Sequence, residues 1–346
     1  MFARWLQRQW FQRRLTPALL FLRLPLLLLL LPLHALFVLV SGWQRRRVRP
    51  QRLPVPVLVV GNLTVGGAGK TPLTLSLAQA LQARGWQPGI VSRGYGRRGD
   101  GVLAVTAASV AAEVGDELLL LARRSGVPVY VGRDRVAAAQ ALLAAQPQVD
   151  LILCDDGLQH LRLGRDIELA VFDGRGAGNG WRLPLGPLRE PLSRLATVDA
   201  VIGNFSGAAT VLPPGVELPA GPAYFPMRLQ PGRFARLDRP VPAVDAGYFR
   251  GRRVHALAGI GDPGRFFATL QGLGIDFVAH PFPDHHAYTV ADLSFAGDDI
   301  LLMTEKDAVK CSALVPGEAW YLPVEAELPP ALIELVEEKL RGRQAA

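Results

Sequence analysis

The segment of residues 61–72, Gly-Asn-Leu-Thr-Val-Gly-Gly-Ala-Gly-Lys-Thr-Pro, constrains the fold more than any other part of the sequence. It follows the apolar run 55–60 and precedes a stretch in which Leu73, Leu77 and Leu81 recur every four residues. A strand, a glycine-rich turn and a helix that begins near Gly-Lys-Thr form the phosphate loop of nucleotide-binding α/β proteins. The sequence therefore predicts a P-loop NTPase-like, mainly parallel sheet flanked by helices.

The residue types of this loop suit a nucleotide phosphate. Glycines allow backbone N–H groups to face the anion, Lys70 reaches the β- and γ-phosphates, and the hydroxyl of Thr71 can ligate Mg²⁺. Thr64 stands where the usual spacing has the first glycine. The residues predicted to bind the nucleotide are Thr64, Val65, Gly66, Gly67, Ala68, Gly69, Lys70 and Thr71.

A second apolar run, residues 149–154, ends in the carboxylates Asp155 and Asp156. In phosphate-loop enzymes an acidic residue at such a strand end helps to hold Mg²⁺ beside the hydroxyl of the loop. A solvated acidic turn is the alternative for this pair taken alone. Together with the loop, the pattern predicts a metal site made of Thr71, Asp155 and Asp156.

The positive charge of the chain is concentrated at its N-terminus. The net charge is +8, but residues 1–52 hold ten arginines and no acidic residue, which leaves 28 basic and 30 acidic residues in the remainder. The basic balance therefore does not indicate a broad nucleic-acid-binding face, and no nucleic-acid or protein partner is inferred. The two cysteines, Cys154 and Cys311, argue against a disulfide framework.

An apolar run of seventeen residues, 24–40, lies inside this basic region, with arginines on both sides. Arginine, tryptophan and phenylalanine alternate before the run, from Arg4 to Arg14. A signal peptide, a short membrane span and a buried core helix are alternatives. Positive charge on both flanks favours a helix or hairpin that anchors the chain at the cytoplasmic membrane face.

Three further segments contain charged residues beside glycines: residues 92–98, 113–117 and 131–135. Arg93 could contact a phosphate or belong to a solvated loop. Asp116 opens a leucine-rich helical segment, where the helix dipole alone favours an acidic residue. These segments are candidate ligand contacts with ordinary structural alternatives.

The second half of the chain predicts a smaller α/β domain. Residues 253–258, 277–279 and 300–303 are strand-like, and a helix is expected to end near Gly272. A stretch rich in proline and glycine, residues 206–222, marks the expected boundary. The predicted organisation is a membrane-anchoring segment at 1–42, a P-loop core domain at 43–210 and a smaller C-terminal α/β domain at 211–346.

Several motifs together resemble those of the tetraacyldisaccharide 4′-kinase family, also described as lipid A 4′-kinases. They occur in the order expected for that family, from the apolar N-terminus to about residue 310. Thr64 agrees with the loop of this family. The motifs that carry the resemblance lie at 61–72, 92–96, 115–117, 155–160, 187–191, 282–286 and 304–307.

The resemblance implies an ATP- and Mg²⁺-dependent kinase. Such an enzyme phosphorylates the 4′-hydroxyl of a tetraacylated glucosamine disaccharide 1-phosphate, a lipid A precursor, at the cytoplasmic face of the inner membrane. It implies Asp116 and His285 as the pair that accepts the hydroxyl proton, with Lys70 also catalytic. The implied substrate contacts are Arg93, Tyr95, Glu117, Arg135, Gln159, His160, Arg189 and Glu190. A membrane-associated GTPase or ATPase, acting as a switch or metal chaperone, is the alternative.

Overall fold

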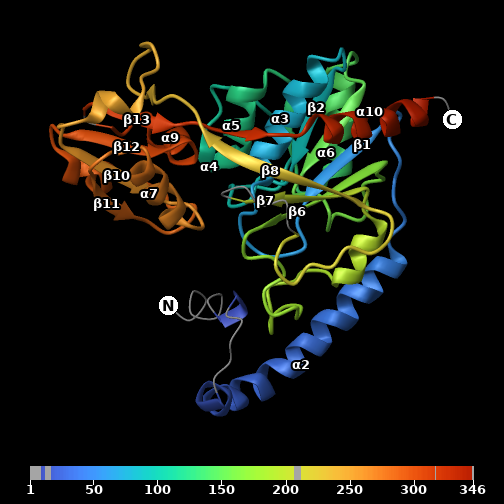
Figure 1. Cartoon of the computed structure of the whole chain (residues 1–346). Helices are drawn as coiled ribbons and strands as arrows, with labels where there is room; N and C mark the ends of the chain where they lie inside the picture. The colour runs from blue at the N-terminus through green and yellow to red at the C-terminus, as the bar shows by residue number, and fades with distance from the viewer. Residues whose placement is uncertain (1–8, 12–16, 206–211, 316, 345–346) are drawn as a thin grey trace. The chain divides into compact units, whose positions relative to one another are not determined.

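The computed structural model describes residues 9–11, 17–205, 212–315 and 317–344 (Figure 1). The chain divides into two compact units, each assembled from separate stretches of sequence. The first unit comprises residues 1–90, 147–228 and 328–346, and the second comprises residues 91–146 and 229–327. The predicted boundary between residues 210 and 211, like the alternating residues 4–8 and 13–14, lies outside the described residues.

Five parallel strands of the first unit follow the order β8-β7-β6-β1-β5. Their bounds are β1 Val57–Gly61, β5 Leu151–Asp155, β6 Ile167–Asp173, β7 Ala200–Asn204 and β8 Ala223–Pro231. Every residue of β1, β5, β6 and β7 is buried, as expected for parallel strands covered on both faces. The predicted P-loop fold and its two key strands are confirmed, whereas β6, β7 and β8 had not been predicted.

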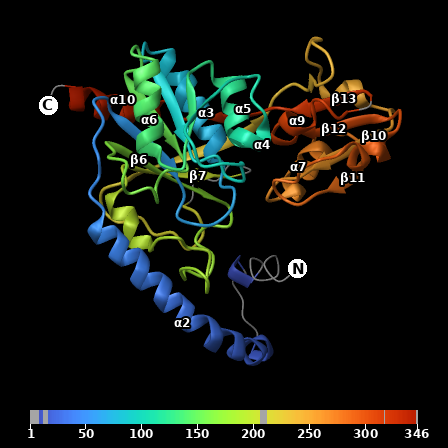
Figure 2. The ribbon, with the colours of Figure 1, turned by 180° about the vertical axis from the view of Figure 1, so that it is seen from behind.

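Helices α3 (Lys70–Gln82) and α10 (Pro330–Gln344) lie side by side in the first unit (Figures 1 and 2). The periodic leucines predicted from the sequence, Leu73, Leu77 and Leu81, are all buried on α3. Glu337 of α10 forms an ion pair with Arg84 at 3.1 Å. The sequence prediction placed α10 in the C-terminal domain, but its buried face packs within the first unit.

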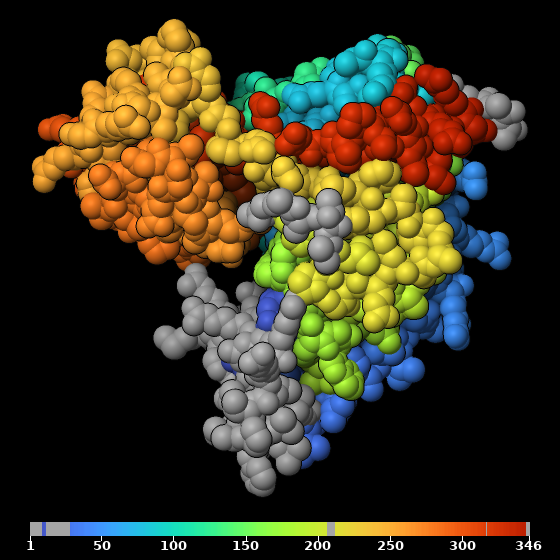
Figure 3. Space-filling view, viewed as in Figure 1, coloured from blue at the N-terminus to red at the C-terminus, as the bar shows by residue number. Residues whose placement is uncertain are grey.

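Helix α2 (Pro17–Arg47) carries the apolar N-terminal run. Residues 28–47 form the one helix in the described part of the chain that is long and apolar enough to cross a membrane. Most of its leucine side chains from Leu28 onward are exposed, and its blue atoms are visible at the surface of the first unit in Figure 3. His34 Nδ1 lies 3.0 Å from the carbonyl oxygen of Arg182, so this apolar helix also contacts the folded unit.

The second unit contains an antiparallel pair, β3 (Leu103–Val105) and β4 (Val129–Val131). Strand β2 (Pro88–Ser92) includes the position at which the chain passes from the first unit to the second. Three helices belong to this stretch: α4 Ala111–Val114, α5 Asp116–Ser125 and α6 Arg135–Ala145. Helix α5 begins directly after Gly115, so Asp116 occupies its first turn as the sequence predicts.

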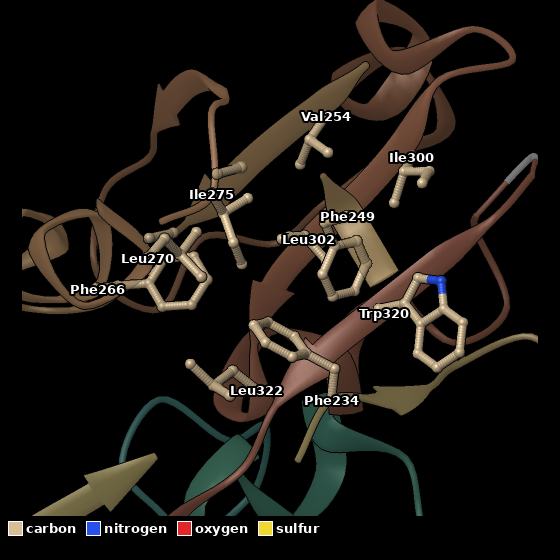
Figure 4. Close-up of a cluster of buried hydrophobic side chains, with 12 residues drawn as sticks. Phe234, Phe249, Val254, Phe266, Leu270, Ile275, Ile300, Leu302, Trp320 and Leu322 are labelled. Atoms are coloured by element: carbon tan, nitrogen blue, oxygen red, sulfur yellow. The ribbon is translucent and has the colours of Figure 1, made fainter. Parts of the chain in front are cut away.

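The smaller sheet of the second unit has the order β11-β10-β12-β13-β9 and is parallel except at β9. Its core contains Phe234, Phe249 and Trp320, with ring centroids 4.7 Å and 6.0 Å from Phe249 (Figure 4). The predicted strands at 253–258, 277–279 and 300–303 and the helix ending near Gly272 are confirmed. The strands of this sheet are β9 Ala235–Arg236, β10 Val254–Ala258, β11 Val278–Pro281, β12 Ile300–Thr304 and β13 Ala319–Leu322. The helices are α7 Pro263–Gly272, α8 Val290–Leu293 and α9 Glu305–Cys311. The elements not yet given are strand β14 Val324–Glu327, outside this sheet, and the short 3₁₀ turns η1 Leu192–Thr197, η2 Ala246–Phe249 and η3 Ser294–Ala296.

Candidate active site

The residues that the sequence singled out form two groups, one in each unit. The phosphate loop, the Asp155–Asp156 pair and the 159–160 and 189–190 segments lie in the first unit. Asp116 and His285 lie in the second unit, as do Arg93, Tyr95, Glu117 and Arg135.

The phosphate loop depends on glycines at two positions. Gly66 has φ 100° and Gly69 has φ 94°, a left-handed conformation that other residues rarely adopt. Gly69 directly precedes Lys70, the first residue of α3, so the loop ends at a helix N-terminus. A Cβ atom on Gly69 would overlap with Nδ2 of Asn204. The N-terminus of a helix presents unsatisfied N–H groups, which favour an anion.

A second chain segment pairs with the phosphate loop through the backbone. The Val65 N–H donates to the Pro187 carbonyl at 2.9 Å, and the Arg189 N–H donates to the Leu63 carbonyl at 2.6 Å. Thr64 forms an antiparallel bridge with Leu188 and is buried. This pairing explains why a side chain larger than glycine is tolerated at position 64, and it places Arg189 beside the loop.

Two cations converge on the same acceptors next to the loop. Lys70 Nζ lies 3.3 Å from Asn62 Oδ1 and 3.5 Å from Asp156 Oδ1. Arg189 also donates to Asn62 Oδ1, and its Nη2 lies 3.2 Å from Asp156 Oδ1. Two positive charges beside one carboxylate leave a local excess of positive charge, which suits a phosphate group.

The predicted metal residues offer oxygen donors of the kind that Mg²⁺ prefers. Asp155 is buried at the end of β5, and Thr74 Oγ1 of α3 donates to its Oδ1 at 3.1 Å. Thr71 is the second residue of α3, one turn before Thr74. The described residues include no cluster of three or more His, Cys, Asp or Glu side chains that could hold a metal. This donor set fits an ion held by few protein oxygens together with substrate phosphates.

Glu190 connects three segments of the first unit. Its Oε1 accepts from Gln159 Nε2 at 2.7 Å, and its Oε2 accepts from Arg45 of α2 at 2.8 Å. Gln159 also donates to the Asn62 carbonyl at 3.2 Å. His160 lies next in the chain, and its carbonyl accepts from Arg165 at 2.6 Å. A hydrogen-bonded path thus runs from the C-terminal end of α2 to the first turn of the phosphate loop.

The second group is centred on Asp116 and His285. His285 Nδ1 donates to Asp116 Oδ2 at 3.0 Å, across 169 residues of sequence. The ring of Tyr95 lies 5.1 Å from the His285 ring, centroid to centroid. Lys306 of α9 lies 3.9 Å from Asp116 Oδ2 and 3.4 Å from His285 Nε2. A carboxylate therefore orients an imidazole whose second nitrogen faces a cation.

The charges of this group alter its protonation. Burial by itself would raise the pKa of Asp116, but the hydrogen bond from His285 and the charges of Lys306 and Lys310 outweigh burial and lower that pKa. The hydrogen bond with Asp116 raises the pKa of His285, against burial and the charge of Lys306. Burial would lower the pKa of Lys306, yet the carboxylates of Glu117, Asp116 and Asp284 raise it. Asp116 is therefore ionised at neutral pH and Lys306 is charged.

The two remaining predicted contacts differ in exposure. Arg93 is exposed in the segment after β2, and Arg135 is buried as the first residue of α6. Glu117 accepts from Lys306 Nζ at 3.0 Å, and this lysine lies beside the Asp116–His285 pair, called the dyad from here on. The roles of Arg93 and Arg135 in binding substrate stay predictions.

Several residues that organise the site were not predicted individually. Asn204, at the end of β7, donates from Nδ2 to the Ala68 carbonyl at 2.9 Å. Asp173, at the end of β6, pairs with Arg175 at 2.7 Å, and Arg175 Nη2 reaches the Gly67 carbonyl at 3.4 Å. Lys306, which lies 3.9 Å from Asp116 Oδ2, was not predicted individually either. A polar residue at the end of an apolar strand was the only available signal for Asp173 and Asn204.

These features define a phosphate-loop α/β protein that binds a nucleotide and also carries a carboxylate–imidazole pair able to accept a proton, the two requirements of a phosphotransferase that acts on a hydroxyl. The family model described as tetraacyldisaccharide-1-P 4′-kinase matches residues 26–341. The chain belongs to this family. The predicted family and enzyme class are confirmed, and the alternative of a GTPase or ATPase switch is not retained.

Similar proteins cover the whole chain. A protein of Dechloromonas aromatica described as tetraacyldisaccharide 4′-kinase is 61% identical over 100% of both chains. One of Azoarcus sp. with the same description is 52% identical over 93% of this chain and 94% of that protein. A crystal structure described as LpxK from Aquifex aeolicus in complex with ATP has a TM-score of 0.75 at 29% identity, covering 90% of this chain and 98% of that one.

The substitution Gly69→Ala tests the left-handed backbone of the phosphate loop. We expect it to lower the free energy of unfolding by about 1–3 kcal/mol, because alanine is strained at φ 94° and its Cβ would displace Asn204. Chemical denaturation measures the effect. In the matched control, Gly67→Ala, a Cβ atom meets nothing within 4 Å, so a change of at most about 0.5 kcal/mol is expected. Equal losses in both variants would contradict this account of Gly69.

The titration of His285 tests the electrostatics of the dyad. NMR titration should give His285 a pKa above 6.5, because Asp116 stabilises the imidazolium. Asp116→Asn should lower this pKa, since burial and Lys306 are then opposed only by the charge of Asp284, whereas Lys306→Met should raise it. His280, whose pKa is lowered by burial and by His255, serves as the internal control and should not respond. An unchanged His285 titration in Asp116→Asn would show that the two side chains do not interact in solution.

Proposed function

We propose that this chain transfers the γ-phosphate of ATP to the 4′-hydroxyl of a tetraacylated glucosamine disaccharide 1-phosphate. The contact between Asp116 and His285 is the observation that carries this proposal. A phosphate loop alone would serve any nucleotide hydrolase, whereas transfer to a sugar hydroxyl also requires a group that accepts the hydroxyl proton. Membership in the kinase family supplies the chemical class of the acceptor.

The residues of the phosphate loop bind the donor. The N–H groups at residues 66–71 and the ammonium of Lys70 would surround the β- and γ-phosphates, with Arg189 adding a second positive charge. Asn62 holds both cations through its Oδ1, which fixes their direction before ATP binds. Gly66 and Gly69 allow the loop to approach the anion closely.

Thr71 and Asp155 or Asp156 would hold Mg²⁺, which supplies charge neutralisation at the phosphates of bound ATP. Thr74 keeps Asp155 in place by donating to one of its oxygens at 3.1 Å. Lys70 and Arg189 flank Asp156, so this carboxylate is balanced by cations on the side of the loop.

Asp116 and His285 act as one unit in accepting the proton. The Asp116 carboxylate is ionised and fixes the imidazole through Nδ1, and Lys306 limits the rise in the pKa of His285. We assign contacts with the substrate to Tyr95, Glu117, Gln159, His160, Arg135 and Arg93.

We also propose that α2 anchors the chain at the cytoplasmic face of the inner membrane. Its exposed leucines would insert among acyl chains, and Arg45, Arg46 and Arg47 at its end would meet anionic headgroups. A lipid acceptor gives a reason for this arrangement, since the acyl chains of the substrate remain in the bilayer while the sugar is phosphorylated.

Turnover with Mg-ATP and a lipid A disaccharide precursor tests the kinase proposal. Asp116→Ala and His285→Ala should each lower kcat by about 10²–10⁴-fold, because proton transfer is lost, and should leave the Kd for ATP unchanged. The double variant should lose little more than either single variant. His286→Ala is the matched control, because His286 forms the same kind of pair with Asp292 at 3.3 Å. ATP hydrolysis without phosphorylated lipid in the wild type would refute the proposal.

Charged substitutions on α2 test the anchor. The double variant Leu36→Asp and Leu39→Asp places carboxylates on side chains that are 57% and 69% exposed. We expect the variant to move from the membrane fraction to the soluble fraction on sedimentation, because a carboxylate in the hydrocarbon region costs about 3 kcal/mol. Leu103→Asp, also on an exposed leucine but in the second unit, should sediment as the wild type does.

A further inference from the structure

A cavity of about 440 Å³ lies beside the C-terminal end of α2 in the first unit. Four of its ten lining residues are arginines, which come from three separate stretches of chain. The arginines are Arg45, Arg52, Arg165 and Arg194, and the one carboxylate of the lining is Glu168. The cavity is distinct from the phosphate loop, none of whose residues line it.

Two of the arginines form a fixed wall. Arg165 Nη1 donates to Glu168 Oε1 at 2.9 Å and to the Leu158 carbonyl at 3.0 Å, and its Nη2 donates to the His160 carbonyl at 2.6 Å. Arg194 is buried and also donates to Glu168 Oε1. Arg194 also lies near Glu190, which Arg45 contacts as well, so Arg45, Arg165 and Arg194 share two carboxylates and keep an excess of positive charge.

The other two arginines are more accessible. The side chain of Arg45 is 40% exposed and contacts Glu190, and that of Arg52 is 76% exposed and lies 3.9 Å from Asp166. Each guanidinium carries five N–H donors in a planar arrangement that matches the oxygens of a phosphate. Arg52 can therefore turn toward an anion in the cavity, and Arg45 has further N–H donors for it while one contacts Glu190.

The cavity is connected to the phosphate loop through Glu190. This carboxylate contacts Arg45 at 2.8 Å and Arg194 at 3.5 Å, both of which line the cavity. Its other oxygen accepts from Gln159, which donates to the Asn62 carbonyl. An anion in the cavity and a nucleotide phosphate at the loop would thus lie on opposite sides of one hydrogen-bonded network.

The position of the cavity also suits a membrane lipid. It opens next to the basic end of α2, where Arg45 follows the exposed apolar side chains of the helix. Phosphate groups of lipids lie at the depth at which such arginines meet the bilayer surface. A soluble metabolite would not require this location.

We propose that this cavity binds a phosphate monoester of the lipid acceptor, namely the phosphate that the disaccharide carries before the reaction. The inference rests on the proposed function, since the family acts on a disaccharide 1-phosphate. The cavity then distinguishes the two ends of the acceptor: the arginines hold the phosphorylated end, and the free hydroxyl remains for the phosphate donor.

Equilibrium binding without ATP tests the assignment, using the full-length protein in detergent micelles. The probes are the tetraacyl disaccharide with its 1-phosphate and the same lipid without it. Arg52→Ala should weaken binding of the phosphorylated probe about tenfold, the effect of one lost charge-assisted hydrogen bond, and should leave binding of the other probe unchanged. Arg49→Ala, an exposed arginine of the same stretch that does not line the cavity, should change neither.

Other results would overturn the inference. Equal effects of Arg52→Ala and Arg49→Ala, or equal losses for the two probes, would show a general charge effect. Weaker binding of Arg52→Ala to phosphatidylglycerol vesicles, with unchanged binding of the phosphorylated probe, would assign the cavity to a bilayer headgroup. Turnover of the wild type is measured separately, so that absence of phosphorylation would refute the proposed function while the binding data still decide the role of the cavity.

Discussion

The parallel arrangement of strands in the first unit is the constraint on which the rest of the site depends. Parallel strands bring their carboxyl ends to the same edge of the sheet. Gly61, Asp155, Asp173 and Asn204 are the last residues of β1, β5, β6 and β7. Asn204 binds the Ala68 carbonyl directly, and Asp173 reaches the Gly67 carbonyl through Arg175. The ends of neighbouring strands therefore hold the phosphate loop in its conformation.

In the second unit, the corresponding constraint on the site is the balance of buried charges. A buried carboxylate is costly unless it is paired, and Asp116 is paired with His285 and lies near the cations of Lys306 and Lys310. Asp307, which is fully buried, accepts from Thr304 and Tyr288 and lies 2.9 Å from Lys310. These contacts hold α9 against the first turn of α5. The lysines that shift the pKa of Asp116 therefore also join the two helices.

Local patterns in the sequence were sufficient to predict much of this structure. The apolar run before residue 61, the glycines of the loop and the leucines of α3 encode a strand, a turn and a helix without reference to other parts of the chain. The acidic pair after β5 was found for the same reason. Residues such as Asn204 and Lys306 were not identified, because their importance comes from partners 136 and 189 residues away. The pairing of Asp116 with His285 was available only from the family resemblance.

The sequence by itself determined the type of loop, its capacity to bind a nucleotide phosphate and the apolar, basic character of the N-terminal helix, because each depends on residues that are close together in the chain. The tertiary structure decided which side chains share a charge. It set Asn62 between Lys70 and Arg189, Glu190 between Arg45 and Gln159, and α10 within the first unit. Electrostatic interactions act through space over a few ångströms, and only the fold brings distant segments within that range.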